Sequence, residues 1–77
     1  MEVHPAALRH GVSESDILHA IENSMVVEEV GEDPMRFLVL GPDSAGNILE
    51  LVVLDRKTGP IIIHAMAMRT RYQRLLE

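Results

Sequence analysis

The chain has no cysteine and few aromatic residues, and these absences exclude several kinds of protein. Without cysteine among its 77 residues it has no disulfide, thiolate metal site or cysteine nucleophile, which fits a reducing cytoplasm. Trp is absent and Phe and Tyr occur once each, which argues against a nucleic-acid surface of stacked rings. No apolar run approaches the roughly 18 residues of a membrane span. The first residues lack the basic and apolar regions of a secretory signal. We therefore expect a cytoplasmic protein without membrane contact.

The apolar content and the length predict one small folded domain over residues 1–77. Hydrophobic residues make up 47% of the chain, which argues against disorder. A chain of this length buries only about 60% of the surface that its unfolded form exposes, so one small core is the limit. So small a core gives the domain little stability, to which a partner chain would add.

Charge is distributed unevenly along the chain, whose net charge is −5. Residues 1–55 carry eleven acids against two cations, Arg9 and Arg36, whereas residues 56–76 carry five cations and no acid. This asymmetry predicts a basic surface that also includes Arg36 and that can meet phosphate or an acidic partner. A solvated helix with ordinary surface charge is the alternative. The five cations are Arg56, Lys57, Arg69, Arg71 and Arg74.

Two helices are predicted before the first long strand. Pro5 suits the first turn of a helix and Gly11 suits the position after its end, which indicates a helix over Pro5–His10. Ser13 has the features of an N-cap, so the second helix should run from Glu14 to about Asn23. His19 should lie on its exposed side. The side that should pack on a sheet comprises Val12, Ile17, Leu18 and Ile21.

Four β-rich runs joined by short turns then predict an antiparallel meander. A C-terminal helix should begin at about Met66, and Glu2-Val3 is a candidate for a short first strand. The predicted fold is α+β: an antiparallel four-stranded sheet with two N-terminal helices on one face and one C-terminal helix at its edge. The four runs are Met25–Val30, Arg36–Leu40, Asn47–Asp55 and Pro60–His64.

Histidine and arginine are the residues of this chain best suited to cleave RNA without a metal. The reaction needs a base for the 2′-hydroxyl, positive charge for the phosphorane and an acid for the leaving oxygen. Arginine matches phosphate oxygens, and histidine titrates near neutral pH. The histidine spacings match no usual zinc signature, so we expect neither a metal nor another cofactor.

His64 has the most specific setting of the four histidines. Strand alternation places it on one face with Ile62. A hairpin register that sets Glu50 opposite His64 would fix the tautomer of the imidazole and raise its pKa. A structural, hydrogen-bonded histidine at a strand end is the alternative.

Short motifs spread over nearly the whole chain match those of one known family. The segment Arg9–Ser13 has the order basic-His-Gly-Val-Ser and precedes an amphipathic helix. Arg36–Gly41 has the form R-x-L-x-x-G, and Ile61–Ala65 leads into a C-terminal segment that carries Arg69 and Tyr72. These motifs resemble those of the BrnT-type toxins, compact members of the RelE-like ribonuclease superfamily.

The resemblance implies a metal-independent endoribonuclease of a bacterial type II toxin–antitoxin system, which cleaves mRNA and is neutralised by a cognate antitoxin. The toxin would act as a homodimer or within a heterotetramer with the antitoxin. His64 is added to the site from its own setting. The candidate catalytic residues are His10, His64, Arg69 and Tyr72, and the candidate RNA-binding residues are Arg9, Arg36, Arg56, Lys57 and Arg71.

A catalytically inactive interaction module of the same fold is the alternative function. The family's arginine just after the alanine is missing, because Met66 follows Ala65. The net charge of −5 also departs from these toxins, which tend to be basic. Both features favour the module, whereas the set of Arg, His and Tyr residues favours the enzyme.

Overall fold

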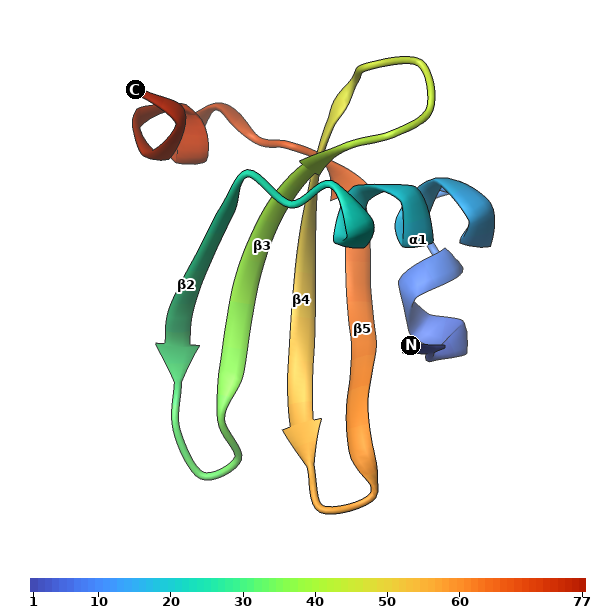
Figure 1. The fold of residues 1–77 in the computed structure, drawn as a ribbon, viewed down its shortest axis with the longest axis vertical. Helices are drawn as coiled ribbons and strands as arrows, with labels where there is room; N and C mark the ends of the chain where they lie inside the picture. Colours follow the sequence, from blue (N-terminus) through green and yellow to red (C-terminus); the bar gives the residue numbers. More distant parts are fainter.

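The computed structural model describes residues 1–77 and centres on a five-stranded sheet of order β1-β5-β4-β3-β2 (Figure 1). The predicted α+β class is confirmed. The helical elements are the 3-10 helix η1 (Pro5–Leu8), the α-helix α1 (Glu14–Glu22) and the 3-10 helix η2 (Thr70–Leu76). The strands are β1 (Glu2–Val3), β2 (Val26–Gly31), β3 (Arg36–Pro42), β4 (Ile48–Arg56) and β5 (Gly59–Ala67).

The sheet is mixed, which corrects the prediction of four antiparallel strands. Strands β2 to β5 form the expected antiparallel meander, but β1 pairs in parallel with β5 through Glu2 with Ile61 and Val3 with Ile62. A strand of two residues has no side-chain periodicity, so the sequence could only name it as a candidate.

Only one of the three predicted helices is an α-helix. The first is a 3-10 helix that ends at Leu8, with the ring of His4 as its cap: Nδ1 accepts a hydrogen bond of 3.0 Å from the N–H of Ala6. The second, α1, begins as predicted, because the Ser13 hydroxyl accepts a hydrogen bond of 3.2 Å from the N–H of Asp16.

The C-terminal helix begins later than predicted, at Thr70 instead of Met66, and it is a 3-10 helix. The residues before it belong to β5, where Met66 pairs with Glu50 and Ala67 with Leu49. Met and Ala favour helix in isolation, but the long neighbouring strand β4 offers backbone and side-chain partners that outweigh this small preference.

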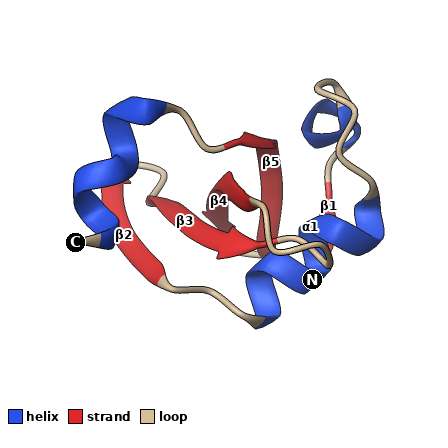
Figure 2. Ribbon diagram, turned by 90° about the horizontal axis from the view of Figure 1, so that it is seen from above, coloured by secondary structure: helices blue, strands red, loops and turns tan.

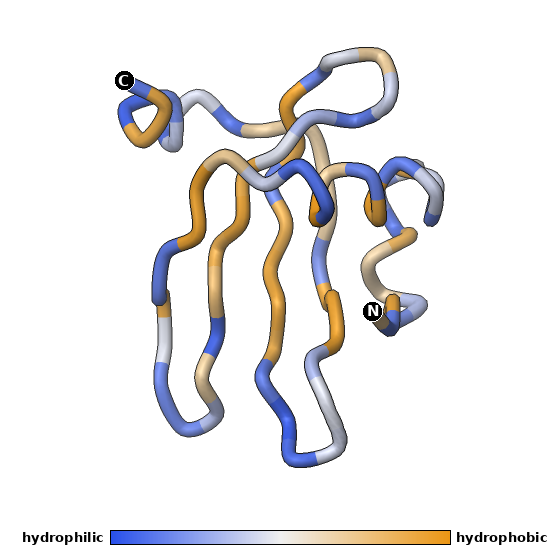
Figure 3. The backbone as a smooth tube through the Cα atoms, in the orientation of Figure 1, coloured by the Kyte–Doolittle hydropathy of each residue, from blue (hydrophilic) through white to orange (hydrophobic).

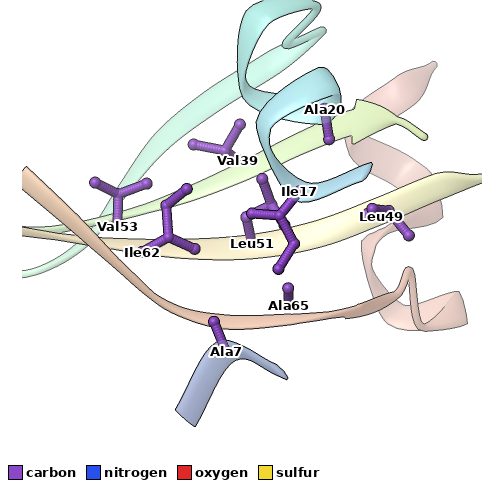
Figure 4. Packing of buried hydrophobic residues seen from close by; sticks show 9 residues of the cluster. All are labelled: Ala7, Ile17, Ala20, Val39, Leu49, Leu51, Val53, Ile62 and Ala65. Atoms are coloured by element: carbon purple, nitrogen blue, oxygen red, sulfur yellow. The ribbon is translucent and has the colours of Figure 1, made fainter. Parts of the chain in front are cut away.

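Helix α1 packs on one face of the sheet against β3 and β4, whereas η1 packs beside β5, next to β1 (Figure 1, Figure 2). The apolar segments of the chain run along the strands and the inner side of α1 (Figure 3). The core between these layers is formed by nine buried residues (Figure 4): Ala7, Ile17, Ala20, Val39, Leu49, Leu51, Val53, Ile62 and Ala65. Val12 and Ile21 pack against this cluster as predicted.

Helix α1 packs closely against β3 at Gly41. A Cβ atom on Gly41 would lie 2.2 Å from the carbonyl oxygen of Ala20, so only glycine fits there. The close approach also brings the ring of His19 to β3, where its Nδ1 lies 2.9 Å from the carbonyl oxygen of Pro42. His19 is therefore half-buried, and the prediction that it stays exposed was wrong.

We expect the substitution Gly41→Ala to lower the free energy of unfolding by about 2–4 kcal/mol, because the new methyl group would push α1 away from the sheet. Urea denaturation measures this change. Gly46→Ala is the control, because Gly46 has open space around it but a φ of +88°, so it reports backbone strain alone. We expect a loss of about 1 kcal/mol there. Equal losses in the two variants would contradict the steric explanation.

Candidate functional site

Glu50 is the one charged residue among the fully buried side chains, with 0% of its surface exposed. It lies on β4 and pairs with Leu40 of β3 and Met66 of β5, so all three side chains share one face of the sheet. The core residues Leu49 and Leu51 flank it in sequence and point to the other face, towards α1. A buried carboxylate is costly unless it is hydrogen-bonded, so its partners identify a candidate site.

Both oxygens of Glu50 accept hydrogen bonds. Oε1 accepts from Nε of Arg69 at 2.9 Å and from Nη2 of Arg69 at 2.5 Å, and it lies 3.1 Å from Nε2 of His64. Oε2 accepts from the backbone N–H of Arg69 at 2.9 Å. The carboxylate is thus held by His64 of β5 and by Arg69, which follows β5 directly before η2. No buried side-chain N or O atom lacks a partner.

These contacts determine the charge of Glu50. Burial by itself would raise the pKa of its carboxyl group, but the hydrogen bonds from Arg69 and then His64 outweigh it, so the pKa is lowered. The hydrogen bond to Glu50 in turn raises the pKa of Arg69. Glu50 and Arg69 are therefore an ion pair at neutral pH.

The ionised carboxylate also determines the tautomer of His64. An ionised carboxylate can only accept, so Nε2 of His64 must carry the hydrogen that it shares with Glu50. In a neutral imidazole this leaves the lone pair on Nδ1. The ring is half-buried, with 27% of its side chain exposed.

The contact between His64 and Glu50 was predicted, but from a register that was wrong. His64 pairs with Val52, two residues from Glu50, so the contact is diagonal. Ile63 is an extra residue in β5, because Val52 pairs with His64 whereas Val53 pairs with Ile62. Because of this bulge, the side chain of Ile62 lies in the core on the side of α1, whereas that of His64 lies on the other face of the sheet. The prediction that the two side chains share a face was therefore wrong.

His10 and Tyr72 lie beside the same group. The ring of His10 meets that of His64 edge-on, with 5.5 Å between centroids and 75° between planes. The guanidinium carbon of Arg69 lies 5.8 Å from the ring centroid of Tyr72 and that of Arg71 lies 5.0 Å away, which is cation–π distance. We call the set His10, Glu50, His64, Arg69 and Tyr72 the Glu50 cluster; it unites the four candidate catalytic residues around one carboxylate.

The candidate RNA-binding residues do not form one basic surface. Arg71 lies beside the Glu50 cluster, and Arg9 is the residue before His10. The turn at Arg56 and Lys57 lies at the opposite end of the sheet from η2 (Figure 1). Arg36 pairs with Leu54 near that same end. The predicted single surface was wrong, because the β4–β5 hairpin carries neighbouring parts of the sequence to opposite ends.

One of these distant cations has partners within the chain, and another lies against the backbone of the neighbouring strand. Nη2 of Arg56 donates to Oε1 of Glu2 at 2.7 Å, which ties β1 to the β4–β5 turn. The guanidinium of Arg36 lies over Gly31, because a Cβ atom there would be 2.3 Å from Nη2. Both arginines therefore lie at the end of the sheet away from the Glu50 cluster, and Arg56 supports the local structure there.

No family model, curated protein or solved structure matches the chain. None of its helices combines the length and the hydrophobicity of a membrane span. No three or more His, Asp or Glu side chains are grouped as a metal site. The geometry of the Glu50 cluster is therefore the basis on which a function can be proposed.

We expect Glu50→Gln to lower the free energy of unfolding by about 2–4 kcal/mol. In one orientation the NH₂ group of the new amide would face the backbone N–H of Arg69. In the other it would face the guanidinium of Arg69 and the ring of His64, so a donor would meet a donor in both. Chemical denaturation measures the loss. Glu28→Gln on β2 removes an exposed carboxylate and should change stability by less than about 0.5 kcal/mol. Similar values for the two variants would show that the buried pair contributes nothing.

The lowered pKa of Glu50 also predicts a pH dependence. Because the folded pKa lies below the ordinary value of 4.5, the stabilisation by ionised Glu50 is complete above that value and is lost as the pH falls through the folded pKa. The stability difference between wild type and Glu50→Gln should therefore shrink from pH 6 to pH 3 in denaturation curves. A difference that stays constant over this range would contradict the assignment.

Proposed function

We propose that the Glu50 cluster is the reactive centre of a metal-independent endoribonuclease. The observation that carries the proposal is the hydrogen bond of 3.1 Å between Nε2 of His64 and Glu50. It orients the imidazole and leaves Nδ1 as a base, on a side chain that is 27% exposed and that shares Oε1 of Glu50 with Arg69. A buried carboxylate that meets an imidazole and a guanidinium near the surface is an arrangement typical of functional sites.

The cleavage step uses two histidines in different roles. Nδ1 of His64 takes the proton from a ribose 2′-hydroxyl, and the freed oxygen attacks the neighbouring phosphorus. The bond from phosphorus to the 5′-oxygen breaks, and that oxygen takes a proton from protonated His10. The products are a 2′,3′-cyclic phosphate and a 5′-hydroxyl end, so no metal, water or redox partner enters this step.

Arg69 supplies positive charge to the transition state. Its Nε and Nη2 bind Glu50, which fixes the plane of the guanidinium, and Nη1 remains available on a side chain that is 43% exposed. Fixed donors stabilise the developing charge of a phosphorane better than mobile ones, because they need no reorganisation. Tyr72 restricts the guanidiniums of Arg69 and Arg71, and Arg9 and Arg71 would contact the RNA backbone on either side.

The biological role that agrees with this chemistry is that of a BrnT-like toxin with a RelE-like fold in a bacterial type II toxin–antitoxin system. RNA is then the substrate, the cytoplasm the place of action and a cognate antitoxin the protein partner, in a homodimer or a heterotetramer. The agreement of Arg9–Ser13, Arg69 and Tyr72 with the family's motifs supports this role.

A catalytically inactive interaction module of the same fold is the second candidate. Two observations favour it: Glu50 neutralises the arginine that would bind phosphate, and the net charge of the chain is −5. In that function the Glu50 cluster would only hold the segment after β5 against the sheet.

The substitution His64→Gln separates these functions. The amide of glutamine can still donate to Glu50, but it has no basic lone pair, so RNA cleavage should fall by about 10²–10⁴-fold while the fold is kept. The assay uses purified protein, a mixed RNA substrate and a chelator, with cyclic phosphate ends as the readout. His19→Ala is the control, because His19 lies on α1 and contacts Pro42 instead of the cluster.

Each outcome of this assay decides between the candidates. Full activity in His64→Gln would remove His64 from the reaction and leave Arg69 and Tyr72 as the candidates. Absence of cleavage by the wild type, with and without ribosomes, would favour the interaction module.

A further inference from the structure

Strand β2 is the open edge of the sheet. It is the last strand in the order β1-β5-β4-β3-β2, whereas at the opposite side β1 and η1 cover β5 (Figure 1, Figure 2). Alternate N–H and C=O groups of an edge strand point outward without a partner strand. The outer edge of β2 can therefore pair with a further extended segment.

Hydrophobic side chains accompany this edge. Met25, Val27 and Val30 are exposed by 57%, 61% and 52%. Val27 also forms one wall of an apolar groove of about 270 Å³ on the side of the sheet that carries α1. The other residues that line the groove are Met1, Ile21, Ser24, Phe37, Val39 and Val53.

The exposed charged side chains of β2 itself are both negative, and the one cation seen close to the strand is Arg36, whose guanidinium lies over Gly31 at its end. No Lys or Arg occurs between Arg9 and Arg36, and the exposed acids of this region include Glu22, Glu28, Glu29, Glu32 and Asp33. Glu28 and Glu29 are consecutive, so one points to each face of β2. A segment that paired with β2 would meet a carboxylate on both of its faces.

We propose that the β2 edge binds an extended, basic segment of another protein, which adds a strand to the sheet. In an antiparallel arrangement two basic side chains would stand opposite Glu29 and Glu28, followed by an apolar side chain opposite Val27. Paired residues share a face of the sheet, so this apolar side chain would enter the groove beside Val27. The backbone supplies affinity, and the carboxylates and the groove supply specificity.

A second copy of the same chain does not fit this edge. If β2 paired with itself in antiparallel fashion, Glu28 and Glu29 of both copies would lie opposite or next to one another, and like charges in these positions are destabilising. The register shift between Glu29 and Gly31 further interrupts a straight edge. Charged residues and bulges are the devices by which sheets avoid pairing with copies of themselves. The β2 edge shares no residue with the Glu50 cluster, so this binding does not depend on RNA cleavage.

Two short peptides test the proposal on the ¹⁵N-labelled full chain. The probe is the acetylated and amidated peptide of sequence TKKVVT, and its matched control is TEEVVT. We expect TKKVVT to shift the amide resonances of β2 and to slow hydrogen exchange at its outward N–H groups, with a Kd at least tenfold lower than that of TEEVVT. Equal affinities, no binding of TKKVVT, or shifts located away from β2 would overturn the proposal.

Two charge-reversing variants locate the interaction. Glu29→Lys should weaken TKKVVT binding by roughly fivefold, because an attractive cross-strand pair becomes repulsive. Glu14→Lys changes the net charge equally but lies on the first turn of α1, and it should leave the Kd within about twofold. A loss in both variants would show attraction by net charge alone and overturn a site at β2. Sedimentation that shows a dimer of the wild type and a monomer of Val27→Lys would assign the edge to a second copy instead.

Discussion

A carboxylate that has no contact with water must be met by hydrogen-bond donors, and in this fold Glu50 imposes that requirement on the last part of the chain. Arg69 satisfies it with both its side chain and its backbone N–H. Helix η2, which follows, has no fully buried residue, and the contacts of Arg69 with Glu50 fix the point at which it begins. The same carboxylate orients His64, and thus structure and candidate chemistry depend on one side chain.

Short-range signals in the sequence were sufficient for much of the fold. The cap at Ser13 located the start of α1, and the turns at Gly and Pro separated the four long strands, of which all but β5 had nearly their observed bounds. Features that depend on pairing partners were not predictable in this way. Three successive isoleucines carry no alternation, so the bulge at Ile63 left no trace in the sequence, and Met66 changed from helix to strand because β4 lies alongside.

The candidate site was predictable in its membership but not in its organisation. His10, His64, Arg69 and Tyr72 are suited to phosphodiester chemistry by residue type, and the fold brings them together. We considered Glu50 only as a partner of His64. It is the one charged residue within the apolar run Ile48–Leu54, and this was the signal that its carboxylate needed further hydrogen-bond donors. The prediction of one basic surface was wrong because the length of β5 separates Arg56 and Lys57, which precede this strand, from Arg69, which follows it.

The parallel pairing of β1 with β5 has a consequence for synthesis on the ribosome. Glu2 and Val3 find their partners Ile61 and Ile62 only about 60 residues later, and Glu50 finds Arg69 later still. A nascent chain that has reached β4 therefore holds a free amino-terminal strand and an unpaired carboxylate among apolar side chains. Its partly formed sheet gains little stability until the segment around Arg69 has emerged, so the fold is completed in one late step instead of from the first residues onward.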